Sequence, residues 1–335
     1  MSPLIDRYNR VIRYLRISIT DRCNLRCIYC MPKDGVPLLD RRDILSYEEI
    51  ERITRTFIHL GITSVRITGG EPLLRRDIIY LISKLSNIQG ISDLSITTNG
   101  TLLSRYAESL KSAGLNRVNI SLDSLYPKRF FEITQGGNLK DVLDGIDSVL
   151  NADLTPVKIN MVVMKGINDN EVIKMVRHFM GRPINLRFIE CMPINRKTFL
   201  PARYFIPMEE VEKMIRREFH LEHEQALVKG AGPADYYRIK GDLLRVGFIS
   251  PISQHFCSNC NKVRLTADGR LRLCLLEERK EFYIGEALHK GISDRILTMM
   301  IKKVIRSKPF MHRFNPDNMA SCRYEFKSLM SSIGG

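Results

Sequence analysis

Three cysteines lie within eight residues near the start of the chain, in the stretch Cys23-Asn-Leu-Arg-Cys27-Ile-Tyr-Cys30. A structural zinc site usually takes four ligands as two CxxC pairs, whereas this stretch offers three thiols. Three thiolates suit a four-iron cluster, because they hold three of its corners and leave the fourth iron open to another ligand. The alternatives are three buried thiols without a metal, and a zinc ion completed by a distant residue.

A second group combines the pair Cys257-Ser-Asn-Cys260 with Cys274, fourteen residues further along the chain. The spacing fits an iron–sulfur cluster and a zinc site about equally, and His255 or His312 is the candidate fourth ligand for zinc. Two other cysteines stand alone, and we expect core positions for both: Cys191 and Cys322.

The elements that must position these groups alternate between short β-branched runs and amphipathic helical runs over the first two thirds of the chain. Six strands are expected, over Tyr14–Thr20, Ser64–Thr68, Asp93–Thr98, Arg117–Ser121, Val157–Val163 and Asn185–Glu190. The capping-box pattern Ser46-Tyr-Glu-Glu49 predicts the start of one helix, which Gly61 ends. Alternating strands and helices predict an α/β fold with a parallel sheet, and six such units predict a partial barrel.

The pattern changes after Pro201, so we expect a boundary near residue 200, with a barrel over 1–200 and an α+β extension over 201–335. The extension begins with an expected helix over Met208–Phe219. Antiparallel strands are expected next, and the second cysteine group follows them: Leu221–Val228, Tyr236–Lys240 and Leu244–Ser250.

Each expected barrel strand carries apolar residues in one phase and polar or charged residues in the other. If helices cover the apolar phase, four cationic residues converge in the barrel interior: Arg16, Arg66, Lys158 and Arg187. Burying these cations without partners is unfavourable, so the pattern predicts an anionic occupant. The alternative is an open antiparallel sheet with this phase in water, which the alternation with helices argues against.

The charge balance points the same way, because 52 basic and 37 acidic residues among 335 give a formal net charge of +15. This excess favours anionic partners without distinguishing nucleotides, nucleic acids and acidic lipids. No apolar run approaches the ~18 residues of a membrane span, and the N-terminal stretch lacks the apolar segment of a secretory signal. We therefore expect a cytoplasmic protein whose cysteines are metal ligands or reactive thiols.

The stretch Thr68-Gly69-Gly70-Glu71-Pro72, together with the CxxxCxxC group after the first strand, resembles the radical S-adenosylmethionine (SAM) enzymes. The resemblance continues through later stretches: Thr97-Thr98-Asn99-Gly100, Ser121-Leu122-Asp123-Ser124, Lys158-Ile159-Asn160 and Arg187-Phe188-Ile189-Glu190-Cys191-Met192-Pro193. With the second cysteine group and the final Gly334-Gly335, the chain is similar to the MoaA family, the radical SAM GTP 3′,8-cyclases of molybdenum cofactor biosynthesis.

The resemblance implies a partial (β/α)6 TIM-type barrel of the radical SAM type, with two [4Fe-4S] clusters at opposite ends of an internal cavity. It assigns one cluster to each cysteine group: Cys23, Cys27 and Cys30, and Cys257, Cys260 and Cys274. In the family, the first cluster cleaves SAM to a 5′-deoxyadenosyl radical, which removes the ribose H3′ of GTP. The nucleotide then closes to (8S)-3′,8-cyclo-7,8-dihydroguanosine 5′-triphosphate, while the second cluster holds the guanine.

Site residues follow from the resemblance by matching position. SAM contacts are implied for Tyr29, Gly70, Ser121 and Met192. GTP contacts are implied for Arg16, Arg66, Thr97, Lys158, Arg187, Lys262 and Arg264, and a part in the reaction for Gly334 and Gly335. Ser64 stands where members often have Lys, and Lys262 where they often have Arg. Because Lys cannot make the planar two-pronged contact of Arg, phosphate contacts there are expected to differ.

The implied partners are GTP, a reductant protein that supplies one electron, and a downstream cyclic pyranopterin monophosphate synthase; a homodimer stays open. We expect no membrane partner, and nucleic acid is disfavoured. One alternative is a radical SAM enzyme with an auxiliary cluster that acts on RNA or a peptide. Another is a zinc-containing nucleic-acid-binding protein that uses the basic C-terminal helices.

Overall fold

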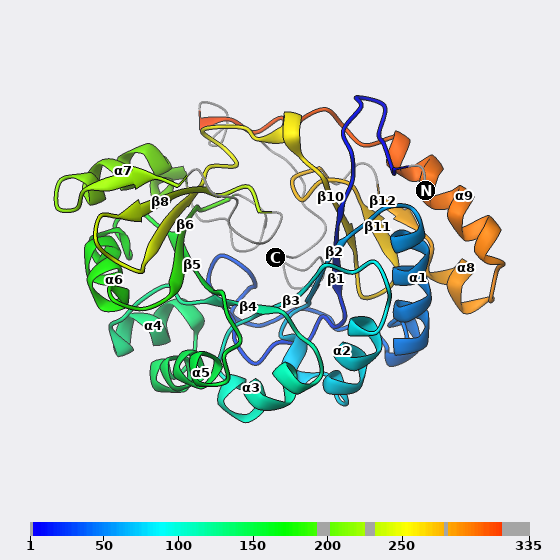
Figure 1. Ribbon diagram of the computed structural model, residues 1–335, viewed down its shortest axis with the longest axis horizontal. Helices are drawn as coiled ribbons and strands as arrows, with labels where there is room; N and C mark the ends of the chain where they lie inside the picture. The colour runs from blue at the N-terminus through cyan, green and yellow to red at the C-terminus, as the bar shows by residue number, and fades with distance from the viewer. Residues whose placement is uncertain (1–2, 193–201, 225–231, 278–280, 317–335) are drawn as a thin grey trace.

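The computed structural model describes residues 3–192, 202–224, 232–277 and 281–316 (Figure 1). In these ranges twelve strands form one curved sheet, in the order β12-β11-β10-β1-β2-β3-β4-β5-β6-β9-β8-β7. The first six strands are β1 (Tyr14–Ser18), β2 (Ser64–Thr68), β3 (Asp93–Thr98), β4 (Arg117–Ser121), β5 (Val157–Val163) and β6 (Ile184–Glu190). The others are β7 (Leu221–His223), β8 (Asp235–Ile239), β9 (Arg245–Ile249), β10 (Lys262–Leu265), β11 (Arg270–Arg272) and β12 (Glu281–Tyr283).

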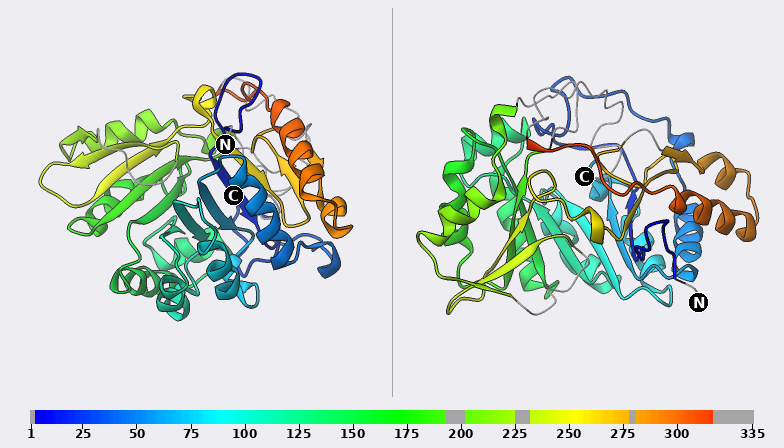
Figure 2. Two further views of the ribbon diagram at one scale, coloured as in Figure 1. Left: turned by 45° about the vertical axis from the view of Figure 1, so that its right-hand side comes forward. Right: turned by 90° about the horizontal axis from the view of Figure 1, so that it is seen from above.

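The predicted partial barrel is confirmed by β1 to β6, which pair in chain order with each strand parallel to the next. Helices surround this curved sheet on its outer side (Figures 1 and 2). They are α1 (Tyr47–His59), α2 (Ile78–Ser86), α3 (Leu103–Ser112), α4 (Pro127–Thr134), α5 (Leu139–Asn151), α6 (Val172–Phe179), α7 (Met208–Arg216), α8 (Gly285–His289) and α9 (Asp294–Arg306). Short 3-10 turns are η1 (Arg41–Asp43), η2 (Pro72–Leu74), η3 (Asp169–Glu171), η4 (Ala202–Tyr204) and η5 (Cys257–Asn259).

The start of α1 shows the local chemistry that its sequence predicts. Ser46 Oγ accepts from the Glu49 backbone N–H at 3.1 Å, and Glu49 Oε2 accepts from the Ser46 N–H at 2.7 Å. Gly61 follows the helix with a φ of +95°, a conformation in which glycine carries no Cβ penalty. The reciprocal cap and the glycine together fix where α1 begins and ends, as predicted.

The C-terminal part of the chain extends the same sheet at both edges. The predicted antiparallel run is confirmed by β7, β8 and β9. However, β9 also pairs in parallel with β6, placing Gly247 opposite Arg187, and β10 pairs in parallel with β1, placing Arg264 opposite Arg16. The sequence predicted neither parallel pairing, because pairing between strands distant along the chain leaves no local pattern. These pairings bring the second cysteine group beside the barrel interior.

The two phases of the barrel strands separate as predicted. The apolar phase joins the helices in one continuous core, to which Leu15, Ile17 and Val65 each contribute completely buried side chains. The polar phase turns to the inside of the curve. Among the described helices, none combines the length and apolar character needed to span a bilayer.

A buried ion pair joins the amino ends of β3 and β4. Arg117 donates from Nε and Nη2 to the two carboxylate oxygens of Asp93, at 2.8 Å and 2.7 Å. Arg117 is completely buried and Asp93 is 4% exposed, so water cannot replace either partner. The pair therefore holds a cation of the polar phase in a fixed place.

We expect Asp93→Asn to lower the free energy of unfolding by about 3–5 kcal/mol, because it leaves the Arg117 guanidinium buried without its counter-charge. Urea unfolding of the cluster-free protein, followed by circular dichroism, measures this change. Glu51→Gln removes the carboxylate from the more exposed Arg55–Glu51 pair and serves as the control; its effect should stay within about 0.5 kcal/mol. Equal effects of the two substitutions would contradict the interpretation.

Candidate active site

A cavity of about 300 Å³ lies inside the curved sheet, and both cysteine groups open into it. Thr68, Thr98 and Ser121 of its lining end parallel strands β2, β3 and β4, and the carboxyl ends of such strands are where barrel enzymes bind their substrates. The structure thus brings together two groups that are more than two hundred residues apart in the chain. The cysteines that line the cavity are Cys23, Cys27, Cys30, Cys257, Cys260 and Cys274.

The first group lies on the loop after β1, which backbone hydrogen bonds tie to its surroundings. The N–H groups of Arg26 and Ile28 donate to the carbonyls of Thr134 and Ile133, each at 2.9 Å. Cys23 Sγ accepts from the Leu25 N–H at 3.4 Å. The loop therefore presents its thiols to the cavity from a fixed backbone.

Gly69 and Gly70 allow the end of β2 to approach this loop closely. A Cβ atom on Gly70 would lie 2.3 Å from the carbonyl oxygen of Arg22, and one on Gly69 would lie 2.6 Å from that of Thr20. The Gly70 N–H donates to the Thr20 carbonyl at 2.7 Å, and the Glu71 N–H donates to that of Arg22 at 2.7 Å. These glycines are needed because backbone contacts backbone here.

Glu71 connects the same loop to β3. It is completely buried and accepts hydrogen bonds from the Leu73 N–H, Thr98 Oγ1 and the Asn99 N–H, at 3.0, 2.8 and 2.7 Å. Burial raises the pKa of Glu71 to about 7, although these hydrogen bonds favour the ionised form. Glu71 belongs to the Thr68–Pro72 motif, but the sequence did not predict it as a site residue. Its hydrogen bonds hold the loops that border the first cysteine group.

Asp123 is the single carboxylate among the described residues that line the cavity. Tyr29 Oη donates to its Oδ2 at 2.7 Å and the Val162 N–H donates to its Oδ1 at 2.8 Å. Burial raises the pKa of Asp123 to about 6. Since both carboxylate oxygens already accept, Asp123 fixes the Tyr29 ring beside Cys27 and Cys30. It was quoted in a motif, but its role was not predicted.

The second group lies on two segments. Cys257 begins η5 and Cys260 follows it, whereas Cys274 follows Leu273. Its thiols receive hydrogen bonds from backbone N–H groups of His312 to Cys257, Lys262 to Cys260, and Leu276 to Cys274. N–H donors to sulfur stabilise thiolates, which are the form that binds iron. The surroundings of these cysteines therefore fit metal-bound sulfur.

The spread of the thiols distinguishes a cluster from a single ion. Zinc–sulfur bonds of about 2.3 Å in a tetrahedron place sulfur atoms about 3.8 Å apart. Among the described residues, only His255, Cys257 and His312 place three ligand atoms all within 4.8 Å of one another. Neither cysteine group forms so compact a set, and three thiols in each group match the three protein ligands of a four-iron cluster with one open iron.

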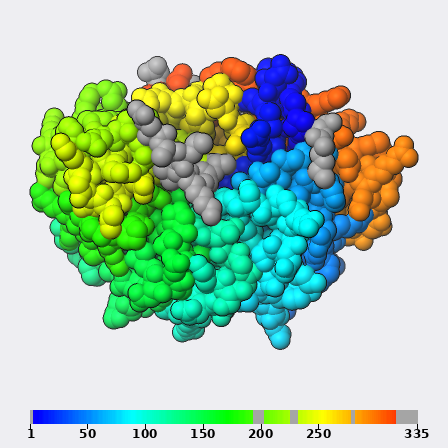
Figure 3. Space-filling view, in the orientation of Figure 1, coloured from blue at the N-terminus to red at the C-terminus, as the bar shows by residue number. Residues whose placement is uncertain are grey.

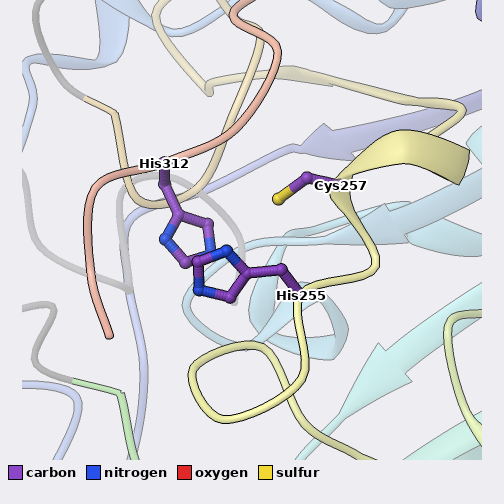
Figure 4. Close-up of side chains that lie close together, drawn as sticks. All are labelled: His255, Cys257 and His312. Atoms are coloured by element: carbon purple, nitrogen blue, oxygen red, sulfur yellow. The ribbon is translucent and has the colours of Figure 1, made fainter. Parts of the chain in front are cut away.

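The two histidines beside Cys257 are engaged with the backbone (Figure 4). His312 Nε2 hydrogen-bonds the Pro251 carbonyl at 2.9 Å, and its Nδ1 accepts from the Phe314 N–H at 3.3 Å. His255 Nε2 hydrogen-bonds the Phe314 carbonyl at 2.7 Å. Burial, and then His255, lower the pKa of His312 to about 4. Because both His312 nitrogens are used, the structure argues against this residue as a zinc ligand.

A row of arginines crosses the inner face of the sheet. Strand register places Arg264 opposite Arg272 on one side and opposite Arg16 on the other, and Arg16 opposite Arg66. Neighbouring strands lie about 4.8 Å apart, so like charges in register repel one another. At one end, Arg272 forms an ion pair with Glu281 at 3.1 Å. An anion in the cavity would relieve the repulsion along the rest of the row.

Burial makes these charges more costly. It lowers the pKa of both Arg16 and Arg66 to about 9, that of Arg264 to about 10 and that of Lys262 to about 7. Among the described residues that line the cavity, the buried polar atoms without a hydrogen-bond partner include Thr97 Oγ1, Asn160 Oδ1 and Arg66 Nε. The cavity therefore combines excess positive charge with polar atoms that can take further hydrogen bonds, as expected for a site that binds an anion.

Comparison with known proteins agrees with this geometry. The family model of the Radical SAM superfamily matches residues 17–179. The family model of Molybdenum Cofactor Synthesis C matches residues 184–314. The chain is 46% identical over 333 residues to the GTP 3′,8-cyclase of Heliobacterium modesticaldum, over 99% of this chain and 100% of that one. The chain belongs to the GTP 3′,8-cyclase family. It is also 48% identical over 305 residues to the GTP 3′,8-cyclase of Thermodesulfovibrio yellowstonii, over 91% of this chain and 94% of the relative.

A solved structure shares the fold. The crystal structure of Streptococcus suis SuiB bound to S-adenosylmethionine matches with a TM-score of 0.61 at 17% identity, over 90% of this chain and 69% of that one. At this identity the likeness concerns the fold alone. It agrees with a radical SAM partial barrel in a member of the GTP 3′,8-cyclase family.

The residues predicted from the family resemblance mostly gather in the cavity. Those predicted for SAM all line it: Tyr29, Gly70, Ser121 and Met192. So do six of those predicted for GTP: Arg16, Arg66, Thr97, Arg187, Lys262 and Arg264. Lys158 is not among the lining residues; it is 1% exposed, with Nζ 5.6 Å from the centre of the Tyr236 ring. Cys191 is buried as expected, and Cys322, Gly334 and Gly335 lie outside the described residues.

We expect Gly70→Ala to prevent iron binding at the first cysteine group, because the new Cβ would displace the backbone that carries Cys23. Iron analysis of the anaerobically reconstituted protein should fall from about eight to about four atoms per chain. Gly232→Ala is the matched control, since a Cβ there meets only Arg187 Nη1 at 3.9 Å. A Gly70→Ala protein with unchanged iron content would contradict the role assigned to this close contact.

Proposed function

We infer that this chain is a radical SAM enzyme that cyclises GTP to (8S)-3′,8-cyclo-7,8-dihydroguanosine 5′-triphosphate, the first step of molybdenum cofactor biosynthesis. The observation that carries the inference is one cavity in which two three-thiol groups border a row of buried cations. The GTP 3′,8-cyclase relatives at 46% and 48% identity support it.

In this proposal Cys23, Cys27 and Cys30 hold one [4Fe-4S] cluster. Cys257, Cys260 and Cys274 hold the other. When bound and reduced, the first cluster would supply one electron that breaks the sulfonium bond of SAM to methionine and a 5′-deoxyadenosyl radical, which would remove the ribose H3′ of GTP. Each group has three thiols, so each cluster keeps one iron for a further ligand, SAM at the first and the guanine at the second.

The chain's own residues would orient the two small molecules. Strand register places three arginines side by side across β10, β1 and β2: Arg264, Arg16 and Arg66. This row suits a triphosphate, because guanidinium groups make short charge-assisted hydrogen bonds to phosphate oxygens. Lys262, on the same strand β10 as Arg264, and Arg187, on β6, add further charge at the cavity. Tyr29, fixed by Asp123, borders the proposed SAM position. The proposal also assigns Gly70, Ser121 and Met192 to SAM, Thr97 and Lys158 to GTP, and Gly334 and Gly335 to the reaction.

The proposal extends to the setting of the enzyme. It includes a cytoplasmic location, a protein that donates one electron, and a synthase that converts the cyclised nucleotide to cyclic pyranopterin monophosphate. It also includes a functional division near residue 200, with SAM handled by the first part and guanine by the second. The use of six cysteines as cluster ligands fits a reducing compartment, where protein disulfides are rare.

Anaerobic incubation with SAM, dithionite and GTP tests the proposed function. We expect 5′-deoxyadenosine to form with GTP and the cyclised nucleotide to accumulate, both measured by liquid chromatography with mass spectrometry. RNA in place of GTP should give neither product. A Cys274→Ala protein should keep about four irons and lose GTP cyclisation. GTP-independent 5′-deoxyadenosine without cyclised nucleotide in the intact protein would count against the proposal.

Arg66→Met tests the anion row. Losing one charge-assisted contact costs about 1.5–3 kcal/mol, so GTP should bind about 10- to 100-fold more weakly. Isothermal titration of the loaded protein measures the dissociation constant. Arg105→Met removes an exposed arginine on α3 and should leave that constant unchanged. Equal affinity in the Arg66→Met protein would remove Arg66 from the proposed substrate contacts.

Lys158 gives the proposal a pH dependence. Burial, followed by the charges of Arg187, Arg117 and Arg66, lowers its pKa to about 6. A bound triphosphate favours the protonated amine and raises this pKa, so GTP binding takes up protons above pH 6 and weakens as pH rises. Titration calorimetry in buffers of different ionisation enthalpy measures the uptake.

The matched control for this titration is Lys158→Arg, whose guanidinium remains charged across this range. The titration of the phosphates of GTP is common to both proteins and cancels in their difference. Proton uptake should be larger for the unmodified protein than for the variant. Equal uptake by the two proteins would show that Lys158 does not respond to the nucleotide.

A further inference from the structure

Lys308 is a buried cation that the predicted machinery does not use. It lies two residues after the end of α9, and it is 2% exposed. Its Nζ donates to the Lys262 carbonyl at 2.8 Å and also to the Leu273 carbonyl. A third hydrogen bond joins it to Cys260. The three donors of the ammonium group therefore meet two carbonyls and one cysteine sulfur.

The two carbonyls belong to the two separate arms of the second cysteine group. Lys262 lies two residues after Cys260, and Leu273 immediately precedes Cys274. Lys308 thus connects the strand that follows the CxxC pair to the strand that leads into the third cysteine. The position is suited to holding the three sulfur atoms at a fixed separation.

The charge of Lys308 has no carboxylate partner among the described residues. Its charge acts on Cys260 and on Cys274, in each case favouring the thiolate. A buried ammonium is stable only near compensating negative charge. Here the compensating negative charge comes from the thiolates themselves.

A neighbouring clamp fixes the segment that carries Lys308. Arg10 donates to the carbonyls of Cys257 at 2.6 Å, Pro309 at 2.6 Å and Phe310 at 2.8 Å, and forms an ion pair with Asp6 at 2.6 Å. Figure 3 shows the N-terminal segment in dark blue on the surface, between the yellow part of the chain and α9. The clamp leaves Lys308 little freedom to turn away from the sulfur atoms.

We propose that Lys308 is a positioning residue of the second cluster, whose ammonium group braces both arms of the cage and makes the bound cluster easier to reduce. The proposal rests on the assignment of a cluster to Cys257, Cys260 and Cys274. A fixed cation beside a cluster stabilises the state with the extra electron, and hydrogen bonds to its sulfurs act in the same direction. The proposal assigns Lys308 no contact with GTP or SAM.

The experiment is an EPR-monitored redox titration of the anaerobically reconstituted full chain, with dithionite as the electron donor. Signals that change on adding SAM belong to the first cluster, and those that change on adding GTP belong to the second. We expect Lys308→Met to lower the equilibrium constant for one-electron reduction of the second cluster about tenfold, which is about 59 mV. The first cluster should not change.

Two further variants are controls. One keeps a positive charge at position 308, and the other changes the net charge of the protein by the same amount at an exposed position. Lys308→Arg keeps the cation and should hold the constant for the second cluster within about twofold of the unmodified value. Lys303→Met removes an exposed lysine from α9, the helix that precedes Lys308, and should leave both clusters unchanged. An unshifted second cluster in Lys308→Met, or an equal shift in Lys303→Met, would overturn the proposal.

Iron content separates this inference from the proposed function. About eight irons in the unmodified protein support the two-cluster assignment, and about four would refute the second cluster itself. If the iron content falls to about four atoms per chain in Lys308→Met alone, thermal melting of the cluster-free proteins distinguishes a role toward the cluster from a role in the fold. Equal melting temperatures for the variant and the unmodified protein support a role of the charge toward the cluster, and a variant several degrees lower overturns it in favour of a brace for the fold alone.

Discussion

Repulsion between buried cations is the constraint on which the rest of this structure depends. Strand register sets Arg264, Arg16 and Arg66 side by side across three neighbouring strands, and burial lowers the pKa of each guanidinium. A folded chain tolerates such a row only where negative charge compensates it. At the outer end Glu281 does so for Arg272. Over the cavity itself, a bound anion would add to the compensation.

The same sheet gives the two cysteine groups different surroundings. The first lies on the loop after β1, whose backbone contacts Gly69 and Gly70 at the end of β2. Glu71 and Asp123 are buried next to this loop. The second lies next to Lys262 and Lys308, whose charges and hydrogen bonds together outweigh the effect of burial and lower the pKa of Cys260. One group thus has carboxylates as neighbours and the other has ammonium groups, so the two bound clusters would differ in electrostatic environment although their ligands are alike.

The C-terminal strands explain how one cavity comes to hold both groups. Since β9 continues the sheet beyond β6 and β10 continues it before β1, the last third of the chain adds to both edges of the partial barrel. Gly247 of β9 faces Arg187, where a Cβ would lie 3.3 Å from Arg187 Cγ, so the close approach depends on a residue without a side chain. Two sequence regions matched by different family models are thereby parts of one continuous sheet.

The sequence by itself determined the features that are set locally. The spacing of Cys23, Cys27 and Cys30, the alternation of apolar and polar residues along each strand, and the capping box at Ser46 all depend on residues close together in the chain. Only the tertiary structure decided which strands lie side by side. That pairing created the arginine row, brought Lys308 to Cys260 and gave His312 its backbone partners, because these contacts join residues whose separation along the chain carries no periodic signal.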